Sequence, residues 1–152
     1  MVRVQLVLVT LTAALFAVFL GAPRAAARAG ELDAEAKALR GEWTTIWVID
    51  DFHRKLEPGD CDSRWIKFFP QKGEVINNSA NGTYKGRYTI DASKNPRHLN
   101  ITWEGKEKPA LYIYKIEGDE LWMSWGGGGP KRPKSFKKED YLGGITIYKK
   151  KQ

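Results

Sequence analysis

Apolar and polar side chains alternate with a period of two along most of the chain after residue 41. In Thr83–Asp91, for example, Tyr84, Tyr88 and Ile90 fall on one side, and charged or hydroxyl side chains fall on the other. This spacing is typical of a β-strand with one buried face. The pattern predicts eight strands: Gly41–Asp50, Arg64–Pro70, Glu74–Asn77, Thr83–Asp91, His98–Glu104, Ala110–Glu117, Glu120–Trp125 and Ile145–Lys149.

The segments between the predicted strands are mostly short and rich in turn-forming residues. Examples are Glu57–Asp60, Asn77–Gly82 and Glu117–Asp119. Eight strands joined in this way form an antiparallel meander, which either closes into a barrel or splits into a sandwich. Closure removes two exposed edges, and this favours the barrel. The one long connection, Gly126–Leu142, fits a loop at the rim of such a barrel.

Helical patterns occur only before the first predicted strand. Glu31–Arg40 is rich in helix formers, and Gly41 is placed to end that helix. Residues 1–29 have the pattern of a secretory signal peptide: Arg3, an apolar stretch over Val4–Leu20, and small residues before Gly30 that offer cleavage sites. An uncleaved membrane anchor is the rival interpretation. The signal peptide predicts an exported protein, periplasmic or extracellular, whose mature domain is residues 30–152.

Length and charge narrow the classes of function. A chain of 152 residues suits one domain. Its formal charge of +7 falls to +4 without the three arginines of the leader, which is a mild surplus. A single cysteine, Cys61, excludes an intrachain disulfide framework and any site that needs several thiolate ligands.

Several short motifs occur in the order found in one family. Gly41-Glu42-Trp43 after a short helix is similar to the Gly-x-Trp that opens the first barrel strand of lipocalins. The later pieces Tyr84–Asp91, Lys94–Arg97, Ile113–Leu121 and Lys131–Phe136 follow in order. Together they resemble a small secreted lipocalin-like domain family that is expanded in planctomycete-type bacteria. Two parts depart from its pattern: Asp51–Arg64, and the ending Lys149–Gln152 in place of an arginine-terminated strand.

The resemblance implies a fold and a structural role for one tryptophan. It implies an all-β, eight-stranded antiparallel lipocalin-like up-and-down barrel with one short N-terminal helix and no established enzymatic activity. By analogy with lipocalins, Trp43 would close one end of the barrel, with Arg132 or Lys149 as the basic side chain across its face. A cation over an indole contributes about 0.5–2 kcal/mol.

Candidates for catalysis and metal binding are sparse. The histidines His53 and His98 lie in different segments, no Gly-x-Ser-x-Gly motif is present, and Cys61 has no histidine at a motif-like spacing. The acidic segment Asp50–Asp62 has the one set of oxygen ligands, but its spacing matches no known metal loop, and a solvated hairpin loop explains it better. We therefore expect no enzymatic activity, no metal and no cofactor.

Basic residues gather in Lys131–Lys138 and Lys149–Lys151. Neither segment has interleaved aromatic residues for base stacking, and the chain is predicted to be exported, so we expect no nucleic-acid partner. Ordinary solvated charge is one interpretation, and weak attraction to an anionic envelope polymer through Lys131–Lys138 is the other. Gly126–Gly129 lacks the features of a phosphate loop and is interpreted as a mobile linker.

The remaining candidates are aromatic and apolar residues predicted to face the barrel interior. Counting by twos from Trp43 and along the other strands gives Trp47, Tyr88, Ile101, Trp103 and Met123, with Tyr114 if Tyr112, Tyr114 and Ile116 face inward. These side chains either line a cup for a small hydrophobic or amphipathic ligand or simply fill the barrel. A mostly filled barrel with a shallow pocket at its mouth is favoured.

The sequence thus predicts a non-catalytic, exported binding protein that takes such a ligand at the barrel mouth. We expect it to be a monomer and to leave the membrane after signal cleavage. The alternative is a cell-envelope module with a filled barrel that binds a protein or polymer through its outer surface.

Overall fold

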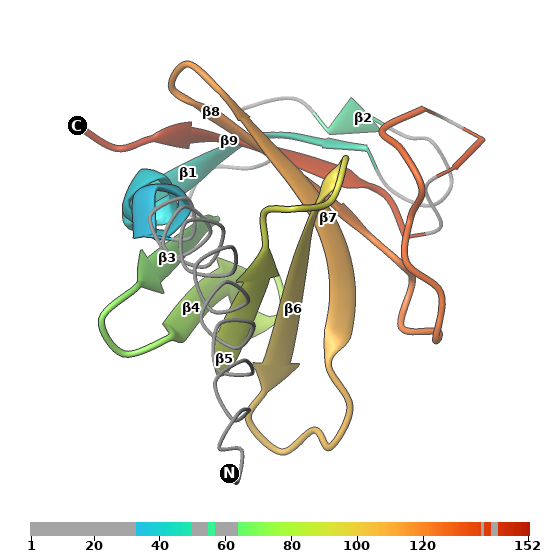
Figure 1. The fold of residues 1–152 in the computed structure, drawn as a ribbon, viewed down its shortest axis with the longest axis horizontal. Helices are drawn as coiled ribbons and strands as arrows, with labels where there is room; N and C mark the ends of the chain where they lie inside the picture. Colours follow the sequence, from blue (N-terminus) through green and yellow to red (C-terminus); the bar gives the residue numbers. More distant parts are fainter. Residues whose placement is uncertain (1–32, 50–54, 57–63, 138, 141–142) are drawn as a thin grey trace, which may run out of the picture.

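The fold is seen in a computed structural model, which describes residues 33–49, 55–56, 64–137, 139–140 and 143–152. A helix at residues 33–39 is followed by nine strands (Figure 1). They are β1 (Gly41–Ile49), β2 (Lys55–Leu56), β3 (Trp65–Phe69), β4 (Glu74–Ser79), β5 (Gly82–Asp91), β6 (Arg97–Trp103), β7 (Ala110–Glu117), β8 (Glu120–Trp125) and β9 (Ile145–Lys150).

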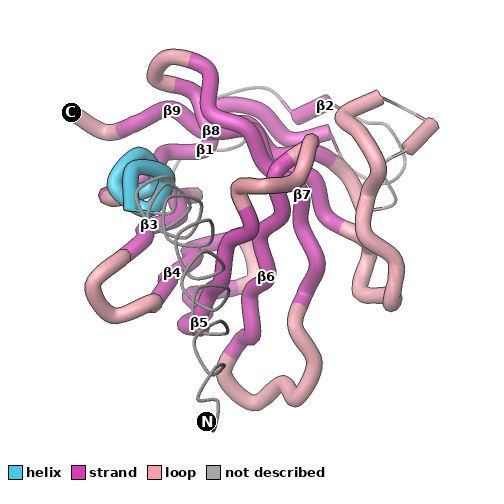
Figure 2. The backbone as a smooth tube through the Cα atoms, viewed as in Figure 1, coloured by secondary structure: helices cyan, strands magenta, loops and turns pink. Residues whose placement is uncertain are grey.

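The strands form a closed antiparallel barrel. From β3 to β9, each strand pairs with the next one in sequence, and β1 pairs with both β3 and β9. Closure therefore takes eight strands, while the two-residue β2 adds to the sheet beside the last part of β1 (Figure 2). The predicted eight-stranded barrel is confirmed, and its strands lie within two residues of the predicted bounds.

One end of the barrel is closed by the helix and by Trp43. The indole is fully buried, and its Nε1 donates a hydrogen bond of 2.8 Å to the carbonyl oxygen of Leu39, the last helical residue. The ammonium of Lys150 lies 4.9 Å from the centre of the Trp43 ring and donates a hydrogen bond of 3.1 Å to the Ala38 oxygen. The helix, the first strand and the last strand are therefore all in contact with the Trp43 side chain. We call this end of the barrel the closed end.

The cation on Trp43 is neither Arg132 nor Lys149, so that prediction is wrong. Trp43 is the direct cross-strand partner of Lys150, and side chains of directly opposite residues share one face of a sheet. Lys149 points to the other face and pairs with Asp119 at 3.4 Å. Lys149 differs from Lys150 by one residue along β9, and a difference of one residue reverses the face on which a side chain lies.

The interior of the barrel is packed with side chains. Tyr88, Ile101, Tyr114 and Met123 are all buried there, as the alternation predicts. Phe68 packs edge-on against Tyr88, with ring centres 5.1 Å apart. The buried cluster consists of Leu39, Trp43, Ile66, Phe68, Val75, Tyr88, Leu99, Ile101, Tyr114, Leu121, Met123 and Tyr148.

Trp47 does not lie in the interior, although counting by twos from Trp43 placed it there. The register of β1 against β9 shifts between Thr45 and Trp47, which marks a β-bulge. Beyond the shift Trp47 opposes Ile147, which belongs to a second cluster with Trp122 and Phe136. Because Tyr148 is in the inner cluster, its neighbour Ile147 faces outward, and so does Trp47.

Some predictions concern residues outside the described part of the chain. They are the signal peptide at residues 1–29, its cleavage sites, His53, Cys61 and most of the acidic segment Asp50–Asp62. Among the residues that are described, no helix is long and apolar enough to cross a membrane.

Replacing Trp43 tests its structural role. We expect Trp43→Ala to lower the free energy of unfolding by about 3–5 kcal/mol, because it removes a fully buried indole. Trp43→Phe keeps an aromatic ring, although a smaller one, and loses the Nε1 donor, so we expect it to lower the free energy of unfolding by less than Trp43→Ala does, about 1–2 kcal/mol. Thr44→Ala, at the exposed neighbouring position, is the control. A Trp43→Ala protein that melts like the wild type contradicts the assignment.

Candidate functional site

The end of the barrel away from the helix is its mouth. Here β5 begins, β6 ends, β7 begins and β8 ends, and the long segment between β8 and β9 starts. Four aromatic residues on the inner face of these strands gather at this rim: Tyr84, Trp103, Tyr112 and Trp125, called here the mouth aromatics. Their parity follows from the buried residues two positions along each strand.

The mouth aromatics form a continuous row over four adjacent strands. The rings of Tyr84 and Trp103 meet edge to face, with centres 6.5 Å apart. Trp103 shares a side-chain hydrogen bond with Tyr112, and Tyr112 is the direct cross-strand partner of Trp125. The two ends of the row are the exposed large hydrophobic residues of the described chain, Tyr84 at 44% and Trp125 at 38%. An apolar surface is therefore presented to solvent at the mouth.

Glycine makes room for this row. Gly86 lies directly opposite Trp103, and a Cβ at Gly86 would come 3.0 Å from Cε3 of the indole and 2.7 Å from the Thr102 oxygen. A side chain at this position would therefore displace Trp103 or separate β5 from β6. At the rim, the Tyr84 hydroxyl donates a hydrogen bond of 3.1 Å to the Asn81 oxygen, which holds that ring beside the β4–β5 turn.

The floor of the mouth is made of tightly packed side chains. Tyr88, Ile101 and Met123 are buried beneath the mouth aromatics, so a ligand there would meet a shallow surface. The predicted candidates therefore separate: Trp103 lies at the mouth, Tyr88, Ile101, Tyr114 and Met123 fill the interior, and Trp47 lies outside.

Burial changes the acidity of the interior tyrosines. Loss of hydration raises the pKa of Tyr112 to about 12, even though the hydrogen bond with Trp103 acts in the opposite direction. Burial likewise raises the pKa values of Tyr88 and Tyr148. For Tyr114, burial and then the neighbouring carboxylate of Glu35 raise the pKa. These hydroxyls therefore stay protonated at neutral pH and add no charge to the barrel.

Arg132 holds the segment between β8 and β9 against the outer surface of the barrel. Its guanidinium donates hydrogen bonds to the backbone oxygens of Leu99, at 3.1 Å, and Tyr112, and to the Asn100 side-chain oxygen. Next to Trp125, the amide of Gly126 donates to the Leu111 oxygen at 3.1 Å. The segment that follows Trp125 is thus fastened to β6 and β7. Arg132 has a structural role, but not the predicted one at Trp43.

Phe136 fastens the same segment at a second place. Its ring meets Trp122 edge to face with centres 6.4 Å apart, and the Lys115 ammonium lies 4.3 Å from the Trp122 ring. Ser135 donates a hydrogen bond of 2.6 Å to Asp140. Parts of Lys131–Lys138 therefore contact the barrel. Among the described residues of this segment, the exposed cations are Lys131, Lys134 and Lys137.

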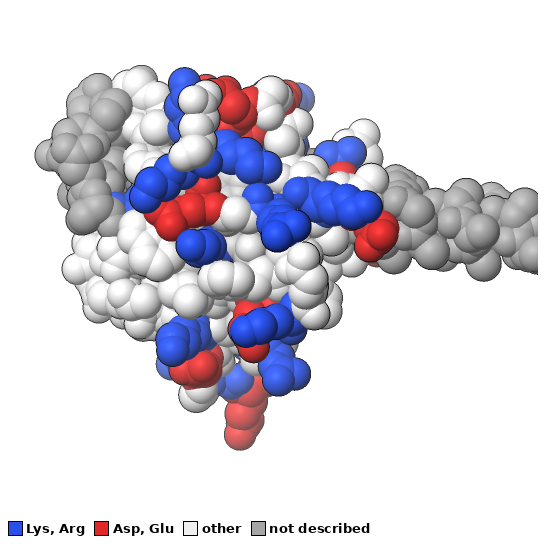
Figure 3. Space-filling model, turned by 90° about the vertical axis from the view of Figure 1, so that its left-hand side faces the viewer, with Lys and Arg blue, Asp and Glu red and all other residues white. Residues whose placement is uncertain are grey.

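The basic residues at the closed end are largely matched by acids. Lys67 and Lys151 both contact the Glu42 carboxylate, at 3.5 and 2.8 Å, and hydrogen bonding from Lys151 is the main cause of a lowered Glu42 pKa. Figure 3 shows blue and red side chains intermixed on the side of the molecule that carries the helix and the C-terminus. On this side of the described chain, basic and acidic side chains therefore lie next to one another.

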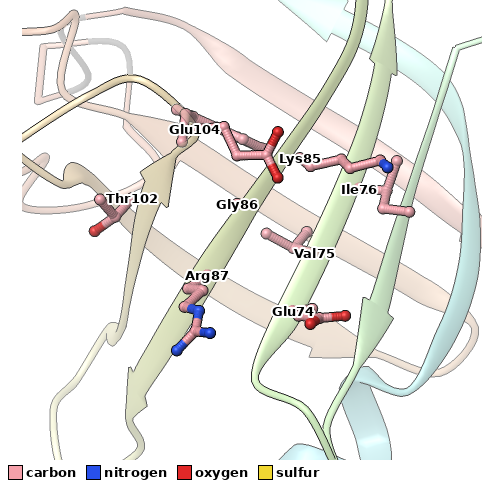
Figure 4. Close-up of a pocket in the computed structure, with 9 residues that line it drawn as sticks. Glu74, Val75, Ile76, Lys85, Gly86, Arg87, Thr102 and Glu104 are labelled. Carbon is pink, nitrogen blue, oxygen red and sulfur yellow. The ribbon is translucent and has the colours of Figure 1, made fainter.

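The outer face of β4, β5 and β6 carries a groove with a volume of about 510 Å³. Its floor is the backbone of the cross-strand row Val75, Gly86 and Trp103, whose side chains point into the barrel. Its walls carry both signs of charge, as Figure 4 shows, and Lys85 extends from β5 toward Ile76. The wall side chains are Glu74, Ile76, Lys85, Arg87, Thr102 and Glu104.

The described residues bring together few groups for catalysis or metal binding. His98 lies on the outer face of β6 opposite Asp91. Partial burial, and then the charge of Arg132, lower the pKa of His98. No group of three or more His, Cys, Asp or Glu side chains in the described residues is arranged to hold a metal ion. The expectations of no enzymatic activity, no metal and no cofactor stay predictions.

Three of the mouth aromatics, Tyr84, Tyr112 and Trp125, were not among the predicted site residues. Tyr84 was assigned correctly to the apolar side of its strand, and Trp125 follows Met123 by two positions. The alternation therefore predicts that these side chains point to the inner face. It does not predict how near to the mouth they lie, because that position depends on the stagger of neighbouring strands.

Comparisons with known proteins add little to this geometry. No family model and no curated protein matches the chain. A crystal structure of a DUF4847 family protein from Bacteroides vulgatus is similar over 78% of this chain and 99% of that chain, at 15% sequence identity and a TM-score of 0.47. The fold assignment rests on the strand pairing described above.

Removing the guanidinium of Arg132 tests whether this side chain holds the segment between β8 and β9 against the barrel. We expect Arg132→Met to lower the free energy of unfolding by about 2 kcal/mol, since hydrogen bonds from a charged donor are lost. Amide hydrogen exchange at Gly126 should become faster. Lys134→Met, at an exposed position of the same segment, is the control. Unchanged exchange at Gly126 in Arg132→Met contradicts the role.

The tyrosine environments predict a loss of stability in alkali. Tyrosine in an unfolded chain has a pKa of about 10, whereas burial raises the pKa of Tyr112 in the folded protein to about 12. As the pH rises, tyrosine therefore loses its proton in the unfolded state before it does so in the folded state. The contribution of Tyr112 to the free energy of unfolding is complete below about pH 10 and is lost as the pH rises to about 12. Absorbance of the phenolate measures this. If every tyrosine of the folded protein ionises at about pH 10, the assignment of Tyr112 to a buried position is wrong.

Proposed function

We propose that this protein is a non-catalytic binding protein that takes a small hydrophobic or amphipathic ligand on the mouth aromatics. The observation that carries the proposal is the position of Tyr84 and Trp125. Both are large apolar side chains left exposed in the described chain, and both belong to one inner-face row at one end of the barrel. Exposed aromatic surface of this kind is costly in water and typical of binding sites.

The packed interior sets the kind of binding. Because Tyr88, Ile101 and Met123 occupy the space below the mouth, a ligand would lie across the rim and stay partly in contact with water. Aromatic rings give an apolar surface with polar groups at its edge. The Trp103 and Tyr112 side chains are hydrogen-bonded to each other, and the Tyr84 hydroxyl donates a hydrogen bond to the Asn81 oxygen. This favours a flat or amphipathic molecule over a long apolar one that would need a deep cavity.

The second candidate function uses the outer surface. The groove on β4, β5 and β6 has a volume of about 510 Å³ and charges of both signs, and it supports a module that binds a protein or polymer of the cell envelope. Lys131, Lys134 and Lys137 are the part of Lys131–Lys138 that such an anionic polymer would meet. We place this second because the groove has no exposed aromatic side chain on its walls.

The cellular setting is proposed from the sequence alone. The motif order resembles that of the small secreted lipocalin-like family, and residues 1–29 have the pattern of a signal peptide. We therefore place the mature domain, residues 30–152, outside the inner membrane, as a monomer with neither nucleic-acid partner nor cofactor.

Binding of the neutral apolar dye Nile red tests the proposal. We expect saturable fluorescence enhancement, with affinity lowered about threefold to tenfold by Trp125→Ala or Tyr84→Ala, since each removes aromatic contact area. Ile76→Ala, which trims an apolar side chain in the outer groove, is the matched control. If Ile76→Ala weakens binding and the two mouth variants do not, the outer surface is the binding site. Absence of saturable binding also contradicts the proposal.

A further inference from the structure

Charged side chains on the inner face of the barrel are few. Apart from tyrosines, the inner-face positions of the described strands and the residue just before β3 supply three ionisable groups: Arg64, Arg97 and Lys150. All three are cations. An interior of this composition favours negative charge wherever a cation has no partner of its own.

Two of these cations have partners at the closed end. The Arg97 guanidinium lies 3.0 Å from the carboxylate of Glu35, which the helix buries against the barrel. Lys150 lies over the Trp43 ring and donates to the Ala38 oxygen. Each therefore has a structural role in holding the helix.

Arg64 is the third cation, and it lies at the other end. The amide of Thr45 donates a hydrogen bond of 2.9 Å to the Arg64 oxygen, so Arg64, the residue before β3, lies opposite Thr45 of β1. Thr45 is buried on the inner face, and so are Ile66 and Phe68, which follow Arg64 by two and four positions. The Arg64 side chain therefore starts on the inner face.

Its position along the barrel places Arg64 toward the mouth. β3 runs from the mouth to the closed end, and Arg64 comes one step before its first residue. On the inner face of β4 and β5, Asn77 and Tyr84 are direct partners, and Tyr84 begins the row of mouth aromatics. Arg64 as a whole residue is half-buried, and no carboxylate of the described residues forms an ion pair with its guanidinium.

We propose that Arg64 makes the mouth selective for anions, so that the ligand is an amphipathic molecule with a carboxylate or similar anionic head group. The apolar part of the ligand lies on the mouth aromatics, and its head group pairs with the guanidinium of Arg64. A guanidinium donates two parallel hydrogen bonds to a carboxylate, and this geometry suits a planar anionic head better than a neutral or cationic one. This inference rests on the proposed function and adds the charge of the ligand to it.

Three probes with the same ten-carbon chain separate the two proposals: decanoate, 1-decanol and decyltrimethylammonium. Binding to the full mature domain is followed by tryptophan fluorescence, since Trp103 and Trp125 lie at the mouth. We expect decanoate to bind about tenfold more tightly than decyltrimethylammonium, because a hydrogen bond to a charged group is worth about that factor. The affinity for 1-decanol should lie between the two.

Substitutions at Arg64 and at a matched outer arginine complete the test. We expect Arg64→Gln to abolish the preference for decanoate and to leave 1-decanol binding unchanged. Arg64→Lys keeps the charge and should retain part of the preference. Arg87→Gln removes the same net charge from the outer face of β5 and should change neither. Melting curves check that each variant is folded.

The possible failures are distinguishable. If the wild type binds 1-decanol but shows no preference for decanoate, the role of Arg64 is wrong and the proposed function stands. If the preference is lost equally in Arg87→Gln and Arg64→Gln, the effect is one of net charge, and the inference is also overturned. If none of the three probes binds the wild type, both proposals fail.

Discussion

The pairing of β1 with β9 is the constraint on which the rest of the structure depends. Six residues of β1 pair with β9, from Trp43 with Lys150 to Ile49 with Ile145, and this joins the first long strand to the last. Closure turns one face of every strand into an interior, so that alternation along the sequence becomes a division between inside and outside. It also brings Lys150 onto Trp43, and the helix then docks against that pair through Leu39 and Ala38.

The two ends of the barrel differ because their side chains have different partners. At the closed end, two polar side chains of the barrel meet partners from the helix: the Trp43 indole donates a hydrogen bond to the Leu39 oxygen, and the Arg97 guanidinium forms an ion pair with Glu35. At the mouth, apolar rings reach solvent instead, and the segment after Trp125 is drawn away to the outer surface by Arg132 and Phe136. A packed interior thus separates an end closed by the helix from an end with exposed aromatic side chains.

The sequence predicts much of this because a strand with one buried face has a strict period of two. The strand positions, the barrel and the inward direction of Tyr88, Ile101, Tyr114 and Met123 follow from that period. Trp47 shows its limit: one extra residue in a bulge reverses the face of all that follows, and no local pattern marks the bulge. The partner of Trp43 and the outer role of Arg132 depend on cross-strand register and on a long connection, which residues near in sequence do not determine.

The most direct test of the account is nuclear magnetic resonance of the tryptophan indole N–H groups during titration with 1-decanol. The protein has six tryptophans, distributed over the closed end, the mouth and the outer surface. Binding at the mouth predicts that the signals of Trp103 and Trp125 shift in a saturable way, while that of Trp43, buried at the closed end, stays in place. Movement of the Trp122 signal with Trp103 and Trp125 unchanged would place the ligand on the outer surface and contradict the account.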